Sequence, residues 1–486
     1  MKKMISVLSV LALLSAASTT AFADSRITPD SADRSSSMNI SYTIAPGYIV
    51  TIPSGVDLST VNTAEIKMTG MSGNEKPMLG YNKTVSISLS NAKNGFSGSD
   101  GKTLSLKDGN ASVSYTLTGV SGKTGKGDLV ASFKFDPNKP LDDYKQTLTF
   151  AVTSKPQHTG NYSDQLIFDI VYGNFVDISK LTGAYQAQNG DILTGKGNAT
   201  AHITVADGAA ITLKDCDITT ITNDESHKWA GITFNGNGTI ILAGENKVKG
   251  GYEDYPGIFV PKNQTLTIKG GGSLEAGSNG NAAGIGGGNK ISCGSINITG
   301  GTVKATGGEN AAGIGSGNSN SSCGNITINS GNVTATSGGG AAGIGSGNGK
   351  SSCGDITITG GTVKASSLKN GVGIGSGNSS FCGNITITGG TVTAIGVING
   401  SGIGCGYRNS CKNISITGGT VKATGGESGA GIGSGYNNSC GNITIKNTVT
   451  KVEATKGTNA PNSIGAGIKS TCGTVTIENG ANVIEK

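Results

Sequence analysis

The chain has 486 residues, and 82 of them are glycine, about one residue in six. Aromatic residues make up 5% and charged residues 14%, and the balance of 37 Lys and Arg against 31 Asp and Glu leaves a net charge of +6. This composition excludes a highly charged disordered polymer. It also excludes collagen, because glycine does not recur at every third position. With only three arginines, Arg26, Arg34 and Arg408, the chain lacks the basic patch of a nucleic-acid binder, so no nucleic-acid partner is expected.

Residues 1–23 have the three parts of a secretory signal peptide. Lys2 and Lys3 form the positive start, 4–17 are apolar apart from serines, and 21–23 (Ala-Phe-Ala) form a small-residue cleavage site. The apolar stretch is short for a bilayer and no later stretch approaches 18 apolar residues, so we expect no membrane span. Cleavage removes two lysines and leaves a mature charge of 6 − 2 = +4. The sequence therefore predicts a secreted, extracellular protein, either free or associated with the cell surface.

Residues 24–175 have the pattern of an antiparallel β-protein. Short runs of alternating apolar and polar residues are separated by Gly, Asn, Asp and Pro, which is typical of half-buried strands. Four of these runs are 48–52, 84–89, 111–117 and 165–171. About seven runs in 150 residues predict a β-sandwich. The stretch 160–164, with the strand after it, resembles the final strand of immunoglobulin-like modules in bacterial surface proteins, so we expect an Ig-like sandwich.

From residue 176 to 486 the sequence is built on a repeat. The best-formed unit reads Cys-Gly-Asn-Ile-Thr-Ile-Thr-Gly-Gly-Thr-Val-Lys-Ala-Thr-Gly-Gly, followed by Ala-Gly-Ile-Gly-Ser-Gly. Units begin at Cys293, Cys323, Cys353, Cys382, Cys411, Cys440 and, in degenerate form, Cys472. The spacings are 30, 30, 29, 29, 29 and 32 residues. A fixed period of this size indicates a solenoid.

Alternation within each unit predicts which side chains point inward. Three short strands per coil would form a prism, with the same residues stacked about 4.8 Å further along in the next coil. Glycines permit the tight corners. The interior of one coil would be lined by Ile344, Ile356, Ile358, Val363 and Ala365. Counting weaker early units, we expect about nine coils, and hence an all-β protein in which the sandwich is followed by a right-handed parallel β-helix.

Several motifs of this region carry a family resemblance. They are 229–232 (Trp-Ala-Gly-Ile), 255–258 (Tyr-Pro-Gly-Ile) and the two halves of the repeat. The region 176–486 resembles secreted β-helix proteins of gut and rumen anaerobes. It is similar, more distantly, to a clostridial family of carbohydrate-binding right-handed β-helices that share the pectate-lyase scaffold. The resemblance implies the β-helix fold and a polysaccharide ligand.

No catalytic residues are predicted from the repeats. Lyases on this scaffold need acidic calcium ligands with a basic proton abstractor, and hydrolases need close pairs of carboxylates. The outward positions of the regular coils are Thr, Ser, Asn and Lys instead. His202 and His227 are interpreted as ordinary strand and loop residues. The candidate cation or catalytic group is the acidic set Asp215, Asp217, Asp224, Glu225, Glu253 and Asp254, whose alternative interpretation is a solvated edge. Four of them are the candidate metal ligands: Asp215, Asp217, Glu253 and Asp254. No cofactor is expected, and calcium is the one candidate ion for those residues.

All nine cysteines follow residue 215, and seven of them form the column that begins each unit. Neighbours in such a column would lie about 4.8 Å apart with parallel side chains, whereas disulfides favour converging Cβ atoms. We therefore expect a ladder of buried thiols, with disulfides between adjacent coils strained but not excluded. Because nine is odd, at least one cysteine cannot pair within a monomer.

The candidate ligand-binding residues stand where aromatic and basic side chains interrupt the repeat. Tyr407 and Tyr436 occupy the same turn of successive coils, with Arg408 beside the first. Lys304, Lys364 and Lys422 mark another face, and Trp229, Tyr252 and Tyr255 form a second aromatic group. Such hydroxyl- and amine-rich faces suit an extended polysaccharide, although a solvated β-surface would have the same composition.

These observations predict a secreted or cell-surface protein that binds a polysaccharide or a host glycoprotein without catalysis. The first alternative is a polysaccharide lyase or glycoside hydrolase with its site on the early coils. The second alternative is an adhesin for host proteins such as mucin or immunoglobulin.

Overall fold

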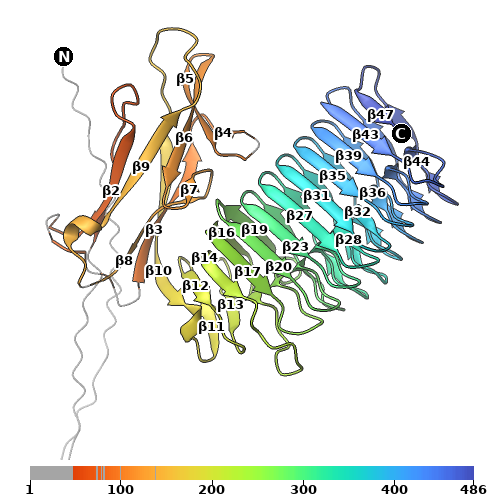
Figure 1. The fold of residues 1–486 in the computed structure, drawn as a ribbon, viewed down its shortest axis with the longest axis horizontal. Helices are drawn as coiled ribbons and strands as arrows, with labels where there is room; N and C mark the ends of the chain where they lie inside the picture. Colours follow the sequence, from red (N-terminus) through yellow and green to blue (C-terminus); the bar gives the residue numbers. More distant parts are fainter. Residues whose placement is uncertain (1–47, 73–74, 78, 80–82, 99, 137) are drawn as a thin grey trace, which may run out of the picture.

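The computed structural model describes residues 48–486, except 73–74, 78, 80–82, 99 and 137. The predicted signal peptide and residues 24–47 lie outside the described residues. The described chain consists of β-strands and two short 3-10 turns, η1 (Leu141–Asp143) and η2 (Ile178–Lys180). A β-sandwich stands against the first coils of a long parallel solenoid, and the two diverge toward the C-terminal coils (Figure 1). The predicted all-β architecture is confirmed. No helix among the described residues is long and apolar enough to cross a membrane.

The sandwich packs one antiparallel sheet against a smaller one. The first contains, in spatial order, β1 (Ile49–Thr51), β2 (Thr63–Thr69), β9 (Lys145–Val152), β6 (Ala111–Gly119), β5 (Thr103–Asp108) and β4 (Phe96–Ser97), with β7 (Gly122–Lys123) on β6. The second contains β8 (Leu129–Lys134), β3 (Lys83–Ala92) and β10 (Leu166–Asp177). Inward side chains such as Ile66, Leu89 and Leu117 are fully buried between the sheets. The strands expected from alternation all lie in this sandwich.

One strand belongs to both parts of the molecule. β10 pairs antiparallel with β3 from Leu166 to Asn174, and then parallel with β12 from Phe175 onward. The buried carboxylate of Asp191 holds this transition. Its Oδ1 accepts 2.7 Å hydrogen bonds from the backbone and side-chain nitrogens of Asn174, and its Oδ2 accepts one of 2.7 Å from the Tyr185 hydroxyl. The sandwich sheet therefore continues into the first coils without a flexible linker.

The solenoid has three sheets. One has eleven strands: β11 (Ala184–Ala187), β13 (His202–Val205), β15 (Ile232–Phe234), β18 (Ile258–Phe259), β21 (Ile285–Gly286), β24 (Ile314–Gly315), β28 (Ala342–Gly345), β32 (Val372–Ser376), β36 (Ile403–Cys405), β40 (Ile432–Gly433) and β44 (Ile464–Gly465). A six-stranded sheet contains the cysteine column: β25 (Ser322–Cys323), β29 (Ser352–Cys353), β33 (Phe381–Cys382), β37 (Ser410–Cys411), β41 (Ser439–Cys440) and β45 (Thr471–Cys472).

The third sheet is continuous with the sandwich strands β10, β3 and β8. Its solenoid strands are β12 (Ile192–Lys196), β14 (Ala210–Ile218), β16 (Gly238–Ala243), β17 (Glu245–Lys249), β19 (Thr265–Gly270), β20 (Ser273–Gly277), β22 (Ser295–Ile298), β23 (Thr302–Thr306), β26 (Ile326–Ile328), β27 (Asn332–Ser337), β30 (Ile356–Ile358), β31 (Thr362–Ser367), β34 (Ile385–Ile387), β35 (Thr391–Ile395), β38 (Ile414–Ile416), β39 (Thr420–Thr424), β42 (Ile443–Ile445), β43 (Lys451–Thr455), β46 (Val475–Ile477) and β47 (Val483–Glu485).

Identical residues stack in register along the solenoid, as the repeat predicts. Ile356 pairs with Ile326 on one side and Ile385 on the other. The five side chains predicted to line the interior are all buried, with exposures of 2% or less. The sequence predicts about nine coils, whereas the sheet that runs from β11 to β44 has eleven strands. The additional strands are β11, which precedes the first predicted unit, and β44, which lies in the closing segment. Each regular coil also has a fourth short strand, which carries the cysteine.

One glycine column shows why the repeat cannot vary at its corners. Gly345 has φ of +136°, and a β-carbon there would overlap the carbonyl oxygen of Gly375 in the next coil. The corresponding glycines of neighbouring coils, such as Gly315, have the same conformation. Because side chains rarely adopt this backbone region and no space is left for one, only glycine allows the coils to stack here.

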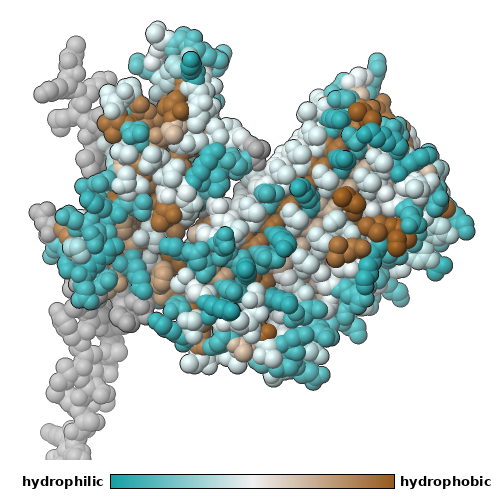
Figure 2. All heavy atoms as spheres, in the orientation of Figure 1, coloured by the Kyte–Doolittle hydropathy of each residue, from teal (hydrophilic) through white to brown (hydrophobic). Residues whose placement is uncertain are grey.

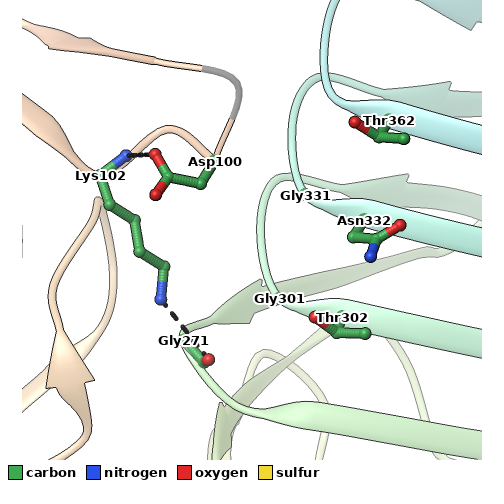
Figure 3. Close-up of a pocket in the computed structure, with 8 residues that line it drawn as sticks. All are labelled: Asp100, Lys102, Gly271, Gly301, Thr302, Gly331, Asn332 and Thr362. Carbon is green, nitrogen blue, oxygen red and sulfur yellow. Dashed lines mark hydrogen bonds between the residues drawn. The ribbon is translucent and has the colours of Figure 1, made fainter. Parts of the chain in front are cut away.

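A buried ion pair of the sandwich lies at the junction with the solenoid. Lys102 Nζ lies 3.2 Å from Asp128 Oδ2, and it also donates to the carbonyl of Gly271 on the solenoid at 3.5 Å. The Asp128 side chain is 2% exposed, so burial raises its pKa, while the ammonium of Lys102 opposes that rise. Figure 3 shows Lys102 reaching toward Gly271 across this joint. The hydrogen bond from Lys102 to Gly271 therefore adds a polar contact to the connection that strand β10 makes between the two domains.

Candidate functional site

An aromatic pocket opens on the early coils. It has a volume of about 260 Å³ and is lined by His202, Lys228, Trp229, Ala230, Thr233, Tyr255, Pro256, Phe259 and Ile291. Three successive coils supply most of this lining: β13 begins at His202, Trp229 precedes β15, and Tyr255 precedes β18. Ile291 follows β21 and comes from the next coil. Because residues about one coil apart in sequence become neighbours in a solenoid, these side chains converge on one hollow.

Trp229 is the central side chain of the pocket. Its indole stacks on the His202 ring at a centroid distance of 4.6 Å and an interplanar angle of 18°. The His227 ring meets it edge-on at 5.0 Å and 63°. Its Nε1 donates a 3.1 Å hydrogen bond to the carbonyl of Ala201, which fixes the ring orientation. The indole is only half-buried, so part of this held ring remains available to a ligand.

Charge in the pocket comes from one cation. Burial lowers the pKa of His202 below its usual value, which favours the neutral imidazole. Lys228 is exposed at the rim, with its Nζ 5.7 Å from the ring centroid of Tyr252 and 3.7 Å from a carboxylate oxygen of Glu225. The pocket is therefore an apolar, aromatic hollow with hydrogen-bonding groups and one ammonium at its edge.

The loop before Trp229 brings together a serine, a histidine and an aspartate. His227 Nδ1 lies 2.7 Å from Asp224 Oδ1 and 3.0 Å from Ser226 Oγ. Hydrogen bonds from Ser226 and then His227 lower the pKa of Asp224 to about 2. A catalytic triad needs the serine and the carboxylate on opposite ring nitrogens, whereas here both contact Nδ1. The cluster shapes a turn that positions Trp229.

The structure brings Tyr407, Tyr436 and Arg408 together, as their positions in the repeat suggest. The two phenol rings stack at 5.7 Å and 29°, and the backbones form a parallel bridge. The Arg408 guanidinium lies 5.1 Å from the centre of the Tyr407 ring, and Lys469 Nζ lies 5.6 Å from that of Tyr436. These ring faces therefore contact one another and neighbouring cations, which leaves mainly ring edges for a ligand.

The three predicted lysines lie in one outward column of the third sheet. The register along this column is Glu275, Lys304, Thr334, Lys364, Thr393, Lys422 and Glu453. Lys304 pairs with Glu275 at 2.8 Å. Threonine separates the lysines, so their charges recur at every second coil. The solenoid face shown in Figure 2 is mostly intermediate in hydropathy, with hydrophilic and hydrophobic patches among the intermediate residues.

The four acidic residues do not gather into one site. Asp215 Oδ1 accepts from the backbone of Glu245 at 3.0 Å, and Asp217 Oδ1 accepts from Thr219. Glu253 and Asp254 lie in the loop after β17. Within the described part of the chain, no three His, Cys, Asp or Glu side chains form a group that could hold a metal ion. Calcium at these residues stays a prediction from the sequence.

The joint between the domains contains a second hollow of about 250 Å³. Its lining includes Asp100 and Lys102 on the sandwich side and Thr302, Asn332 and Thr362 on three successive coils (Figure 3). The charged groups already have partners: Asp100 pairs with Lys123 at 2.9 Å, and Lys102 pairs with Asp128. We therefore interpret this hollow as part of the domain joint.

The cysteine column matches the predicted ladder in its first four members only. Cys293, Cys323, Cys353 and Cys382 are buried thiols, as is Cys216. Two disulfides close the column's C-terminal part: Cys405 with Cys411 within one coil, and Cys440 with Cys472 between adjacent coils. The Cys405–Cys411 disulfide was not predicted from the sequence. The feature of the sequence that could have indicated this disulfide is Cys405, which stands where the neighbouring coils have Ser376 and Ser434.

The role of His202 was not predicted from the sequence. His202 and His227 were expected to be ordinary strand and loop residues, whereas both contact Trp229. The available signal was the separation of 27 residues between His202 and Trp229, about one coil of this solenoid.

Comparison with known families supports the fold. The Beta helix repeat family matches five segments: residues 296–318, 326–348, 356–378, 385–407 and 414–436. These segments are successive coils of the regular solenoid, so the chain is a parallel β-helix protein. No curated protein and no solved structure matches the chain.

Proposed function

We propose that this protein is a secreted or cell-surface glycan-binding protein without catalytic activity, and that its primary site is the Trp229 pocket. The observation that carries the proposal is the stack of Trp229 on His202 at the base of an open, aromatic hollow. A pyranose ring has an apolar C–H face and a polar hydroxyl edge. Aromatic walls with a few polar groups suit both parts of such a ligand.

The rigidity of the indole supports this assignment. Its Nε1 donates a hydrogen bond to the carbonyl of Ala201, and the His202 ring stacks on the indole. A ligand would thus meet a ring that loses little conformational freedom on binding, which favours affinity. The resemblance of the repeats to carbohydrate-binding β-helices supports the same ligand class.

The absence of acidic groups from the pocket lining supports binding without hydrolysis. Among the described residues that line it, none is Asp or Glu. Glycoside hydrolysis ordinarily uses two carboxylates flanking the scissile bond. The nearby Asp224 is held by Ser226 and His227, which would compete with a catalytic role.

The test is a retention assay of the whole chain on insoluble polysaccharides, mucin and serum proteins, with product analysis of every sample. We expect retention on a polysaccharide without released sugars. Trp229→Ala should weaken retention at least about tenfold, since a stacked aromatic contact and its buried area contribute roughly 1.4 kcal/mol or more. Lys228→Ala changes an exposed residue of the pocket rim and leaves the packed indole in place. It should weaken retention on the polysaccharide less than Trp229→Ala does.

Tyr407→Ala is the matched control, because it removes an aromatic ring from a late coil. Retention that falls with Tyr407→Ala but not with Trp229→Ala would move the site to the tyrosine stack. Unsaturated or reducing sugar products would replace the proposal with a lyase or hydrolase. Retention on proteins alone, unaffected by competing glycans, would indicate an adhesin for host proteins.

A further inference from the structure

Eight of the nine cysteines in the solenoid can be divided into pairs, which leaves one cysteine over. The column has seven members, so pairing between adjacent coils alone would leave one unpaired. Cys405 supplies an eighth cysteine at a position where neighbouring coils hold Ser376 and Ser434. It bonds to Cys411, the fifth member of the column. Four cysteines then precede this pair and two follow it, and both numbers are even.

The two that follow are already bonded, as Cys440–Cys472, with their Cα atoms 4.7 Å apart. Three of the four that precede, Cys323, Cys353 and Cys382, are paired in register on consecutive coils, and Cys293 begins the unit one coil earlier. In the second half of this set, the Sγ atoms of Cys353 and Cys382 lie 3.1 Å apart. In the first half, the backbone nitrogen of Cys293 donates a 2.7 Å hydrogen bond to the carbonyl of Ser322, which places Cys293 beside Cys323. Contact with Cys293 and burial raise the pKa of the Cys323 thiol.

We propose that the folded chain forms two further disulfides, Cys293–Cys323 and Cys353–Cys382, giving four in total and leaving Cys216 as the single free thiol. Cys216 lies 77 residues before Cys293, where the column begins, and is fully buried, with its backbone nitrogen donating a hydrogen bond to Asn246 Oδ1. No other cysteine is close to it in the described chain.

Each new bond is a two-electron oxidation. The two thiols of a pair lose two protons and two electrons as the Sγ–Sγ bond forms, and a disulfide oxidant such as glutathione disulfide accepts them and is released as two thiols. The column thiols are 7% exposed or less. Since buried thiols react slowly, we expect the bonds to form while the coils are stacking and the column is still accessible.

The pairing would strengthen a solenoid where it is weakest. Each coil contacts only its neighbours, so stability depends on the interfaces between coils. The proposed bonds and Cys440–Cys472 each cross a different interface, at 293/323, 353/382 and 440/472. The intra-coil bond Cys405–Cys411 crosses none, and its role in this scheme is to remove the odd member of the column.

The test is thiol counting and peptide mapping of the whole chain refolded in a buffer of glutathione and glutathione disulfide. After unfolding without reductant, an alkylating reagent should label 9 − 8 = 1 cysteine, Cys216. Mapping by trypsin is feasible because Lys304, Lys350 and Lys364 separate the four column cysteines. Peptides 291–304 and 305–350 should be linked to each other, and 351–364 should be linked to 370–408. Labelling of 9 − 4 = 5 cysteines, or a Cys323–Cys353 link, would overturn the proposal.

Cys405→Ser provides a matched variant, since serine is the residue of neighbouring coils at this position. Two cysteines should then be labelled, Cys216 and Cys411, while the three links between coils stay unchanged. In the unaltered chain, Cys382 and Cys405 share the tryptic peptide 370–408, so a link to this peptide does not say which of them is bonded. In the variant, Cys382 is the one cysteine left in that peptide, and the link can be assigned to it. Pairing of Cys411 with Cys382 or Cys440 would show that the register of pairs is not fixed, and would contradict the proposal.

Discussion

The sandwich and the solenoid are both β-structures, but their cores are specified in different ways. In the sandwich, unlike residues such as Met68, Leu104 and Tyr144 fill one enclosed core, and strands distant in sequence pair with one another. In the solenoid, Ile stacks on Ile and Gly on Gly through successive coils. A residue of the sandwich has a unique environment, whereas a residue of a regular coil has copies in the coils beside it.

This difference indicates where function lies. Residues that recur in every coil maintain the stack, so departures from the repeat are the informative positions. Trp229, the Tyr407–Tyr436 pair and Cys405 are all such departures, and each makes a contact that the regular coils lack. In a repeat protein, then, the irregular residues are the first candidates for binding and cross-linking.

The largest expected effect contrasts glycines in the two regions. Gly345→Ala should destabilise the solenoid by about 3 kcal/mol or more, because the added methyl group meets the next coil and the backbone conformation is strained. Gly95→Ala in the sandwich should cost about 1 kcal/mol, since φ is +79° there but nothing lies within 4 Å. Urea unfolding with limited proteolysis measures both. Equal losses would contradict the idea that close stacking, rather than φ alone, restricts the solenoid column.

The second-largest effect is expected at the Lys102–Asp128 ion pair, where the sandwich meets the solenoid. Lys102→Met should destabilise the protein by about 3 kcal/mol at neutral pH, because it leaves the buried Asp128 carboxylate without its cation. Burial raises the pKa of Asp128 in the folded state, so the fold holds the proton more tightly than the unfolded chain does. Stability linked to this group is therefore present at low pH and is lost as the pH rises through the raised folded pKa.

The loss in Lys102→Met should accordingly shrink as the pH falls from neutrality toward the acidic range. Denaturant unfolding of both proteins across that range gives the comparison. Lys123→Met is the control, since the Lys123–Asp100 pair is nearly half exposed and should contribute little. A loss in Lys102→Met that grows on acidification would show that Asp128 is not the group responsible.

The smallest effect is expected on the outer face of the solenoid. Lys304→Ala removes an ion pair with Glu275 in which both side chains are at least half exposed. Such pairs contribute about 0–1 kcal/mol, so thermal unfolding should change little. A large decrease in melting temperature would show that the lysine column stabilises the coils, and would weaken its interpretation as a solvated face.

The repeat made most of the solenoid predictable. Its period fixed the coils, and alternation identified interior residues such as Ile356 and Val363, because buried positions repeat with the fold. The shared strand β10 was not predictable, since a strand that changes partner between Asn174 and Phe175 has an ordinary alternating sequence. The stack of His202 on Trp229 depends on the exact length of one irregular coil, which the degenerate early units do not define.

The most direct test of the account uses the fact that Trp229 is the only tryptophan of the chain. Its fluorescence therefore reports on the proposed site alone. Titration with the polysaccharide that retains the protein should shift the emission and saturate at the concentrations at which retention saturates, and Tyr407→Ala should leave the titration unchanged. Binding that saturates with no change in Trp229 emission would contradict the placement of the glycan in this pocket.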